Sequence, residues 1–358
     1  MRNGIIPKRE KARRHYLSPP PLVVFEVIIA FCIVSPFFIF LLCTYFSFCQ
    51  GELCYILEKR IEFLYNHSMF KYYGKYAPYL FLLPAGIVLL IFFFIPFFQT
   101  FLLSFQDYST SIYHPSWVGF ENYVKLFHNP IFYKVLWNTF IYLFVAVPIL
   151  AIFPLFVAIL INQKIRGVTL YKIIIYLPVI VSIVVAAIAF KWLYADQGIL
   201  NYIVTSLGLK PIGWLTDPKW ALYSVVWVTI WKGIGYYMII YLAALMSVPK
   251  ELYEACDIDG ANFLTKHLTV TIPHIMPTIA LVTTISAISA MKVFAEIYVM
   301  TKGGPLNSSK TIVYYIYERA FENLDLGYAS AMAVVLLVIV MAFSLINIFC
   351  FERNKYQL

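Results

Sequence analysis

The stretch that organises this chain is ELYEACDIDGANFLTKHLTVTIPHIMP, which runs from Glu251 to Pro277. It is long and polar, yet it lies away from both ends of the chain and joins two strongly apolar segments, 221–246 and 278–300. A protein embedded in lipid that keeps such a loop is expected to use it for contact with another molecule.

The rest of the chain is very apolar. Of its 358 residues, 62% are hydrophobic, 18% are aromatic and only 13% are charged, a balance too apolar for a water-soluble globule. A hydrocarbon core about 30 Å thick needs about 20 apolar residues per helix. Six segments meet this condition: 78–105, 135–161, 173–194, 221–246, 278–300 and 327–350. They are continuously apolar rather than alternating, so we expect an all-α polytopic membrane protein with a six-helix core and no barrel.

Basic residues in the short loops predict the orientation of these spans, because Lys and Arg collect on the cytoplasmic side. Lys164, Arg166 and Lys172 follow the second span. Arg353 and Lys355 follow the sixth span, and Lys59, Arg60, Lys71 and Lys75 precede the first. The segments 106–134, 195–220 and 301–326 then face outward. The polar loop from Glu251 to Pro277 faces the cytoplasm.

The first 76 residues complicate this topology. They are basic near the start and contain a further apolar segment, 22–49, whose crossing would leave 50–77 outside and invert the core. Three arrangements stay open: the segment dips in and returns near Ser35-Pro36, it spans with the basic terminus outside, or weak apolar patches between Leu53 and Phe70 complete a hairpin.

No pattern of a catalytic or cofactor-binding centre occurs in the sequence. It has no GxxxxGK[ST] phosphate loop, no HExxH helix and no GxGxxG after a strand, and its six cysteines lack zinc-site spacing. We therefore expect no enzyme, no bound metal, no cofactor and no nucleic-acid partner. The chain therefore offers no site of its own at which ATP phosphates could bind.

The polar loop itself is predicted to form two short helices with a bend between them. Residues 250–255 and 262–270 have helical composition, and Gly260 between them is free to adopt a positive φ. Small residues at Ala255 and Gly260 let another backbone approach, and carboxylates at Glu254 and Asp259 offer anchors for basic or amide groups.

The pattern Glu254-Ala255-Cys256, with Gly260 and then Ile272-Pro273, resembles the EAA motif of ABC importer permeases, the loop that docks on an ATPase subunit. The variant ELYEACDIDGA at 251–261, followed by TIPHIMP at 271–277, is similar to the loop of the carbohydrate-uptake subfamily that includes the maltose and glycerol-3-phosphate importers (MalF/UgpA-like). Further motifs of that subfamily follow in order: YLFLLP at 79–84, WVGFENY at 117–123, Asn138-Thr139, TKGGP at 301–305 and GYASA at 327–331. The departure is Cys256, where the motif usually has Ala.

The resemblance implies a six-helix core of the type I importer permease (MetI-like) over 77–352, in a bacterial cytoplasmic membrane. The extension 1–76 and a cytoplasmic tail, 353–358, then lie outside the core, and the EAA loop covers 249–277. It implies that the docking residues are Glu254, Ala255, Cys256, Asp259, Gly260, Ala261 and Pro273. It also implies a second, different permease, two ATPase subunits that bind ATP and Mg, and an extracytoplasmic solute-binding protein.

The resemblance further places the solute site near mid-membrane on the two spans that flank the loop. Candidate residues are Gly233, Tyr236 and Tyr237 before the loop, and Ser286 and Ser289 after it. Hydroxyl groups and aromatic rings suit sugars, although the same residue types also pack transmembrane helices together. The segment from Ser289 to Val293 lacks the Asn and Phe pattern of maltose permeases, so maltose itself is not indicated.

Two charges in the fifth span form a further candidate. Lys292 and Glu296 are four residues apart, so on a continuous helix they share one face and are expected to pair, unless Glu296 lies at the outer surface.

An ion-coupled secondary transporter is the alternative function, and it requires buried coupling carboxylates, for which only Glu296 and Glu26 are candidates. A membrane-embedded enzyme would need a cluster of His, Asp or Glu at membrane depth. Histidines instead fall in loops or at span ends, as at His67, His114, His128, His267 and His274.

Overall fold

The computed structural model describes residues 77–108, 116–163 and 167–352. The predicted extension 1–76, with its apolar segment 22–49, and the tail 353–358 lie outside the described residues. Internal packing divides the chain into two units, one ending at Pro96 and one starting at Phe97. The boundaries 77–352 of the permease core therefore stay a prediction.

The first predicted span forms as a long apolar helix. It consists of α5 (Ala77–Leu89), a π-helical turn (Leu90–Phe94) and α6 (Ile95–Leu103). Its stretch Leu82–Leu103 is long and apolar enough to cross a membrane, and none of the residues in this stretch is buried. A surface of this kind is suited to lipid or to another protein chain.

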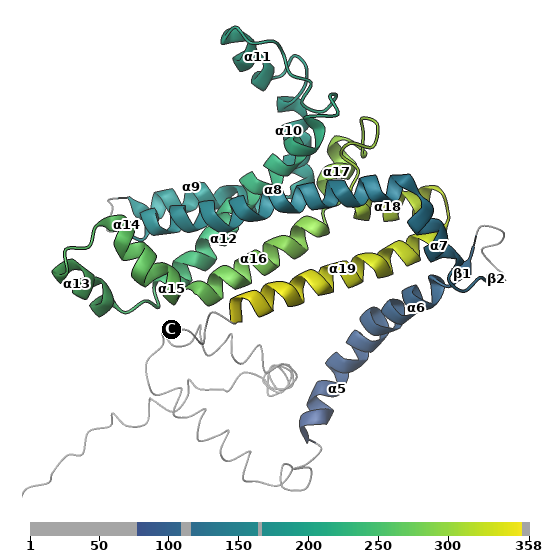
Figure 1. Cartoon of the computed structure of the whole chain (residues 1–358), viewed down its shortest axis with the longest axis horizontal. Helices are drawn as coiled ribbons and strands as arrows, with labels where there is room; N and C mark the ends of the chain where they lie inside the picture. Colours follow the sequence, from purple (N-terminus) through teal and green to yellow (C-terminus); the bar gives the residue numbers. More distant parts are fainter. Residues whose placement is uncertain (1–76, 109–115, 164–166, 353–358) are drawn as a thin grey trace, which may run out of the picture. The chain divides into compact units, whose positions relative to one another are not determined.

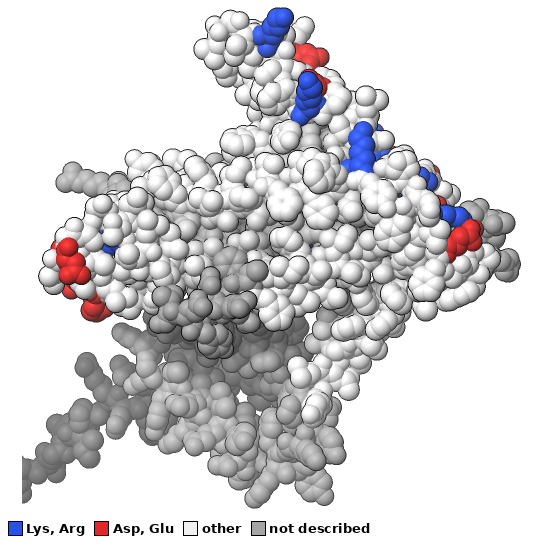
Figure 2. All heavy atoms as spheres, viewed as in Figure 1, with Lys and Arg blue, Asp and Glu red and all other residues white. Residues whose placement is uncertain are grey.

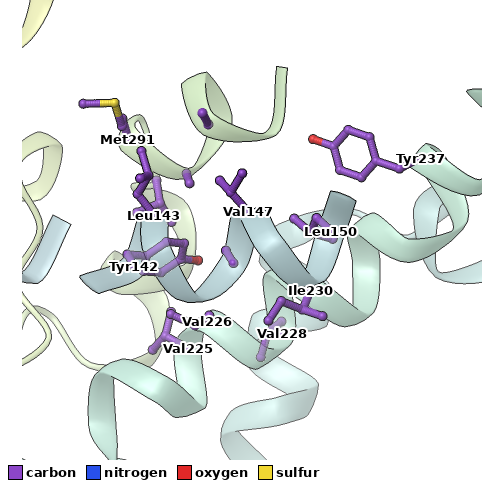
Figure 3. Packing of buried hydrophobic residues seen from close by; sticks show 14 of the residues in the cluster. Tyr142, Leu143, Val147, Leu150, Val225, Val226, Val228, Ile230, Tyr237 and Met291 are labelled. Carbon is purple, nitrogen blue, oxygen red and sulfur yellow. The ribbon is translucent and has the colours of Figure 1, made fainter. Parts of the chain in front are cut away.

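The second unit is a bundle built around α8 (Pro130–Ile161), which packs against both α12 (Ala221–Leu245) and α16 (Met276–Met291). The last helix, α19 (Leu326–Glu352), packs along α16 (Figure 1). Helices that are apolar on all sides can bury one face and leave the others to lipid. Figure 3 shows the buried side chains of α8 and α12 meeting in this core, among them Tyr142, Leu143, Val147, Leu150, Val225, Val226, Val228 and Ile230.

The third predicted span, 173–194, is a bent pair of helices. It consists of α9 (Val168–Ile180) and α10 (Ile183–Leu193), which meet at an angle of 95°. The helix breaks at Val181, whose backbone is extended (φ −67°, ψ 133°), shortly after Pro178 inside α9. A proline removes a backbone donor and strains the preceding turn, so it favours a bend here.

Five described helices are long and apolar enough to span, or six if the bent pair α9–α10 counts as one span. This confirms the all-α, six-span prediction for the described part of the chain. The remaining helices are short: α7 (Glu121–His128), α11 (Ile199–Ser206), α13 (Lys250–Ile258), α14 (Phe263–Lys266), α15 (Ile272–His274), α17 (Ala295–Met300) and α18 (Ile312–Tyr317), with π-helical turns at His267–Thr271 and Glu318–Glu322.

A small hairpin connects α6 to α7. Its strands, β1 (Gln106–Asp107) and β2 (Ser116–Trp117), pair antiparallel. The buried amide of Asn122 donates to the carbonyl oxygens of Ser104 (3.0 Å) and Gln106 (2.9 Å). Gly327 lies so close that an added Cβ would be 1.9 Å from the Gln106 carbonyl oxygen. Two of the predicted motifs, WVGFENY and GYASA, thus meet at this hairpin.

Candidate functional site

The polar loop folds into two helical arms joined at a glycine bend, as the sequence predicts. The first arm is α13, and Gly260 follows it with φ +72°. Behind the bend, the Ala261 N–H donates to the Cys256 carbonyl at 2.9 Å and the Gly260 N–H donates to the Asp257 carbonyl at 3.2 Å. These bonds occupy carbonyl groups that a helix end leaves free, and they require the left-handed conformation that glycine adopts without strain.

The second arm begins at Asn262, whose side chain accepts from the Thr265 N–H at 2.8 Å and so caps α14. It continues through the π-helical turn into α15, so Pro273 lies within a run of helical backbone instead of starting it. The second predicted helix, 262–270, is therefore confirmed, and it extends further than expected. We call the two arms, residues 250–274, the coupling hairpin.

Side-chain bonds tie the two arms of the coupling hairpin together. The Thr271 hydroxyl is 2.8 Å from the Tyr253 hydroxyl on α13 and 2.8 Å from Nδ1 of His267. Lys266 forms an ion pair with Asp257 across the bend. Burial, with the adjacent Lys266 ammonium, lowers the pKa of His267 below its usual 6.5, which favours the neutral ring.

The outer surface of the coupling hairpin is open to a partner. Glu254, Ala255, Asp259 and Gly260 are exposed, whereas Cys256, Ala261 and Pro273 are partly buried. Apolar side chains stand beside the carboxylates, and Ile258 is 87% exposed. Figure 2 shows the acidic side chains of this end gathered over α13. Exposed apolar groups bordered by charge are typical of a protein docking surface.

The predicted pathway residues divide into exposed and buried groups. Tyr236, Ser289 and Lys292 are exposed, whereas Tyr237 and Ser286 are buried. The structure brings Tyr237 of α12 beside Ser289 of α16.

Gly233 serves helix packing, because an added Cβ would lie 2.8 Å from Leu150 of α8. The Ser286 hydroxyl donates to the Thr283 carbonyl of its own helix at 3.1 Å. These are contacts of helix packing, the alternative role of these residue types, and a role of Gly233 and Ser286 in solute contact stays a prediction.

The expected pair of Lys292 and Glu296 on one helix face is wrong. The fifth span breaks after Met291, and α17 begins only at Ala295, so the two residues are not on one continuous helix. Lys292 is exposed, whereas Glu296 is only 9% exposed. The described part of the chain contains no ion pair between them.

Glu296 instead belongs to a polar chain that crosses three helices. Its Oε1 accepts a hydrogen bond from the Thr229 hydroxyl of α12 at 3.0 Å, and that hydroxyl is 2.5 Å from the Tyr142 hydroxyl of α8. A buried carboxylate is stable only with such partners.

Lys232 lies on α12 about one turn after Thr229, within electrostatic reach of Glu296. Its Nζ atom donates to the carbonyl oxygens of Val179 (2.8 Å) and Val181 (2.7 Å) at the end of α9. Lys232 was not among the predicted site residues. The signal was present, since it is the single charge within the apolar segment 221–246.

The family comparison decides the class of protein. Residues 123–350 match the model of the family described as binding-protein-dependent transport system inner membrane component. The chain belongs to this family. It is therefore a transport permease of the bacterial plasma membrane, and the ion-coupled alternative is not favoured.

The permease is similar to proteins of known kinds. It is 36% identical to an arabinooligosaccharides transport system permease protein, AraP, of Bacillus subtilis, over 77% of this chain and 89% of that protein. Among solved structures it is similar to a bacterial ABC transporter involved in the import of the acidic polysaccharide alginate (TM-score 0.70, 27% identity, 78% of this chain and 96% of that one). It is also similar to an alginate transporter in complex with an alginate pentasaccharide-bound periplasmic protein (TM-score 0.68, 26% identity, 78% and 95%).

The TKGGP motif of the permease forms a tight turn at the end of α17. Gly303 has φ +76°, and an added Cβ there would lie 2.9 Å from the Lys310 side chain. Lys310 is itself buried and ion-paired with Glu318 at 2.7 Å. The motif therefore allows the chain to turn back over a buried cation.

Proposed function

We propose that this permease is the membrane-spanning subunit of an ATP-driven ABC importer that carries a carbohydrate into the cytoplasm. The solute class is a di- or oligosaccharide or a related compound such as glycerol-3-phosphate. The observation that carries the proposal is the coupling hairpin. This polar element connects two spans, its arms are bonded to each other, and its outer surface is exposed.

Hydrolysis in this proposal takes place on a partner. Two ATPase subunits bind ATP and Mg and dock on the coupling hairpin and on its counterpart in a second, different permease. Because Thr271 ties both arms, movement of an ATPase subunit is transmitted to α12 and α16, the two spans that the hairpin joins. This permease binds neither ATP nor a cofactor. An extracytoplasmic binding protein delivers the solute, as the solved complex of a similar transporter with its periplasmic protein supports.

The similar proteins support a carbohydrate as the cargo. The named relative transports arabinooligosaccharides, and the similar solved transporter imports a polysaccharide. Tyr236 and Tyr237 on α12, with Ser289 of α16 beside Tyr237, offer the neutral hydroxyls and rings that recognise sugars.

The direct test combines uptake with an uncoupling variant. The complex, reconstituted in proteoliposomes with ATP inside and the binding protein outside, is offered radiolabelled arabino-oligosaccharides, lactose, maltodextrins and glycerol-3-phosphate. We expect ATP-dependent uptake of at least one of them. ATP-independent accumulation, or uptake of none, would overturn the proposal.

Gly260→Asp should leave the permease in the membrane but abolish ATPase docking and uptake. Gly119→Asp is the matched control, because Gly119 also has a positive φ (+58°) and also has no atom within 4 Å of an added Cβ. Both variants carry similar backbone strain, but only Gly260 lies in the coupling hairpin. Equal loss of uptake in both would show a general folding defect and would contradict the docking role.

A further inference from the structure

Five aromatic side chains form a continuous group at the junction of α17 and α18. We call this group, Phe294, Tyr298, Tyr314, Tyr317 and Phe321, the aromatic ridge. Phe294 lies against Tyr298 (ring centroids 5.5 Å apart, planes at 23°), and Tyr317 lies 5.1 Å from Phe294 and 5.3 Å from Phe321. Such spacing is that of rings in direct contact.

The aromatic ridge is anchored on one side and open on the other. Tyr314 is only 3% exposed and fixes the base of the group, whereas Tyr298 is 38% and Phe321 68% exposed. The rings therefore present ordered faces outward without freedom to collapse into the core.

Polar groups accompany these ring faces. The rings of Tyr298 and Tyr317 meet edge to face with centroids 5.4 Å apart, and the exposed Glu322 lies within electrostatic reach of Tyr317. Glu318 is already paired with Lys310. Tyrosine rings alone are also found where a membrane protein meets the membrane–water interface, so the exposed carboxylate of Glu322 next to the rings is the feature that favours a polar ligand. Rings with hydroxyls at their edges suit a ligand that has both apolar C–H faces and hydroxyl groups.

The position of the aromatic ridge suits solute entry. The coupling hairpin leads into one end of α16, and α17 with the ridge follows the other end (Figure 1). Phe294 lies five residues after Ser289, in the break between α16 and α17. If the hairpin faces the ATPase, the ridge faces the side from which the binding protein delivers its solute.

We propose that the aromatic ridge is an outer saccharide-binding site, on which a sugar ring stacks after it leaves the binding protein and before it enters the spans. The inference rests on the proposed carbohydrate import and adds a site to it. Tyr298 and Phe321 supply the stacking faces, and the hydroxyl of Tyr317 bonds sugar hydroxyls.

The first test asks whether Tyr298 contributes through its aromatic ring or only through its apolar surface area. Uptake of the saccharide accepted by the wild-type complex is measured against the concentration of loaded binding protein. We expect Tyr298→Leu to raise the KM by about three- to tenfold, the value of one aromatic contact. Tyr298→Phe and Tyr298→Trp should stay within about twofold of wild type. Tyr223→Leu is the matched control, since Tyr223 lies in the first turn of α12, outside the aromatic ridge, and is 47% exposed.

A Leu variant that works as well as the Phe variant would overturn the stacking site while uptake itself continues. Wild-type uptake of no saccharide would instead overturn the proposed function, so the two failures are distinguishable.

The second test identifies the occupant directly. Tyr298→p-benzoylphenylalanine in the assembled complex is illuminated during turnover with the radiolabelled saccharide. Label on the permease, absent when the same change is made at Tyr223, supports the site. Crosslinks only to the second permease or to lipid would contradict it.

Discussion

The Nζ atom of Lys232 lies 2.7 Å from the carbonyl oxygen of Val181, at the point where α9 and α10 meet at 95°. The same ammonium donates to Val179 at 2.8 Å. The last carbonyls of a helix have no partner within the helix and carry partial negative charge. A cation from α12 therefore compensates for the helical bonds that the bend removes, and it fixes the bend to the neighbouring span.

We expect Lys232→Met to destabilise the permease by about 1–2 kcal/mol, because the carbonyls at the bend lose their donor within the membrane. The midpoint of thermal unfolding of the detergent-solubilised protein measures this. Lys191→Met is the control, since Lys191 is exposed and its contact with the Val299 carbonyl is 3.4 Å long. An equal loss in both variants would remove the special role of Lys232.

Thr229→Val keeps the shape of the side chain but removes the donor to the buried carboxylate of Glu296. A buried charged group that loses a hydrogen bond costs about 1–3 kcal/mol, so stability and uptake should both fall. Thr229→Ser keeps the hydroxyl and should restore most of both. The double variant Thr229→Val, Glu296→Gln should lose less than the sum of the single variants, because the two residues are coupled. Additive losses in the double-variant cycle would show that the bond contributes nothing.

Gly327→Ala should destabilise the fold by about 1–3 kcal/mol, since the new methyl group overlaps the Gln106 carbonyl and forces the hairpin away from α19. Gly86→Ala is the matched change in a helix with open space, where no atom lies within 4 Å of an added Cβ. It should be neutral or slightly stabilising. Urea or thermal unfolding of both variants compares them, and an unchanged Gly327→Ala midpoint would contradict the close approach.

The coupling hairpin should weaken on acidification. The pKa of His267 is lower in the folded protein than its ordinary 6.5, so the unfolded form binds more protons below neutral pH. The contribution to stability is present above about pH 6.5 and is lost as the pH falls through the lowered pKa. Hydrogen exchange of residues 250–274 between about pH 7.5 and about pH 5 measures this loss. His267→Gln keeps a polar group near Thr271 without titrating, and should show a flatter pH profile.

Much of the coupling hairpin could be predicted because its signals are local. Gly260 marks the bend by its free φ, and the helical composition on each side needs no distant partner. The bend between α9 and α10 is different. Pro178 indicates a weak point, but a proline inside a span is often tolerated, and the carbonyl groups at the bend are bonded by Lys232 from another helix, which local sequence does not reveal.

The partner of Glu296 was also beyond prediction, for a related reason. Side chains four residues apart lie side by side only on an unbroken helix. The break between α16 and α17 at 292–294 contains no proline or glycine, so the sequence gives no sign of it. Thr229 and Tyr142 lie 67 and 154 positions earlier in the sequence numbering (296 − 229 and 296 − 142), so only tertiary packing brings them to the carboxylate. Composition could have identified Lys232 as a charge at membrane depth, but not its contacts.

Helix α8 has 32 residues, from Pro130 to Ile161. At a rise of about 1.5 Å per residue it is about 48 Å long, whereas the hydrocarbon layer is about 30 Å thick. An upright α8 therefore extends beyond the hydrocarbon. Lys134, near its start, donates to the Leu306 carbonyl at 2.7 Å, and Asn138 donates to the Asn307 carbonyl at 2.8 Å. The surplus length thus lets the first turns of α8 support the turn after TKGGP through these two bonds, beyond the length of helix that a hydrocarbon layer requires.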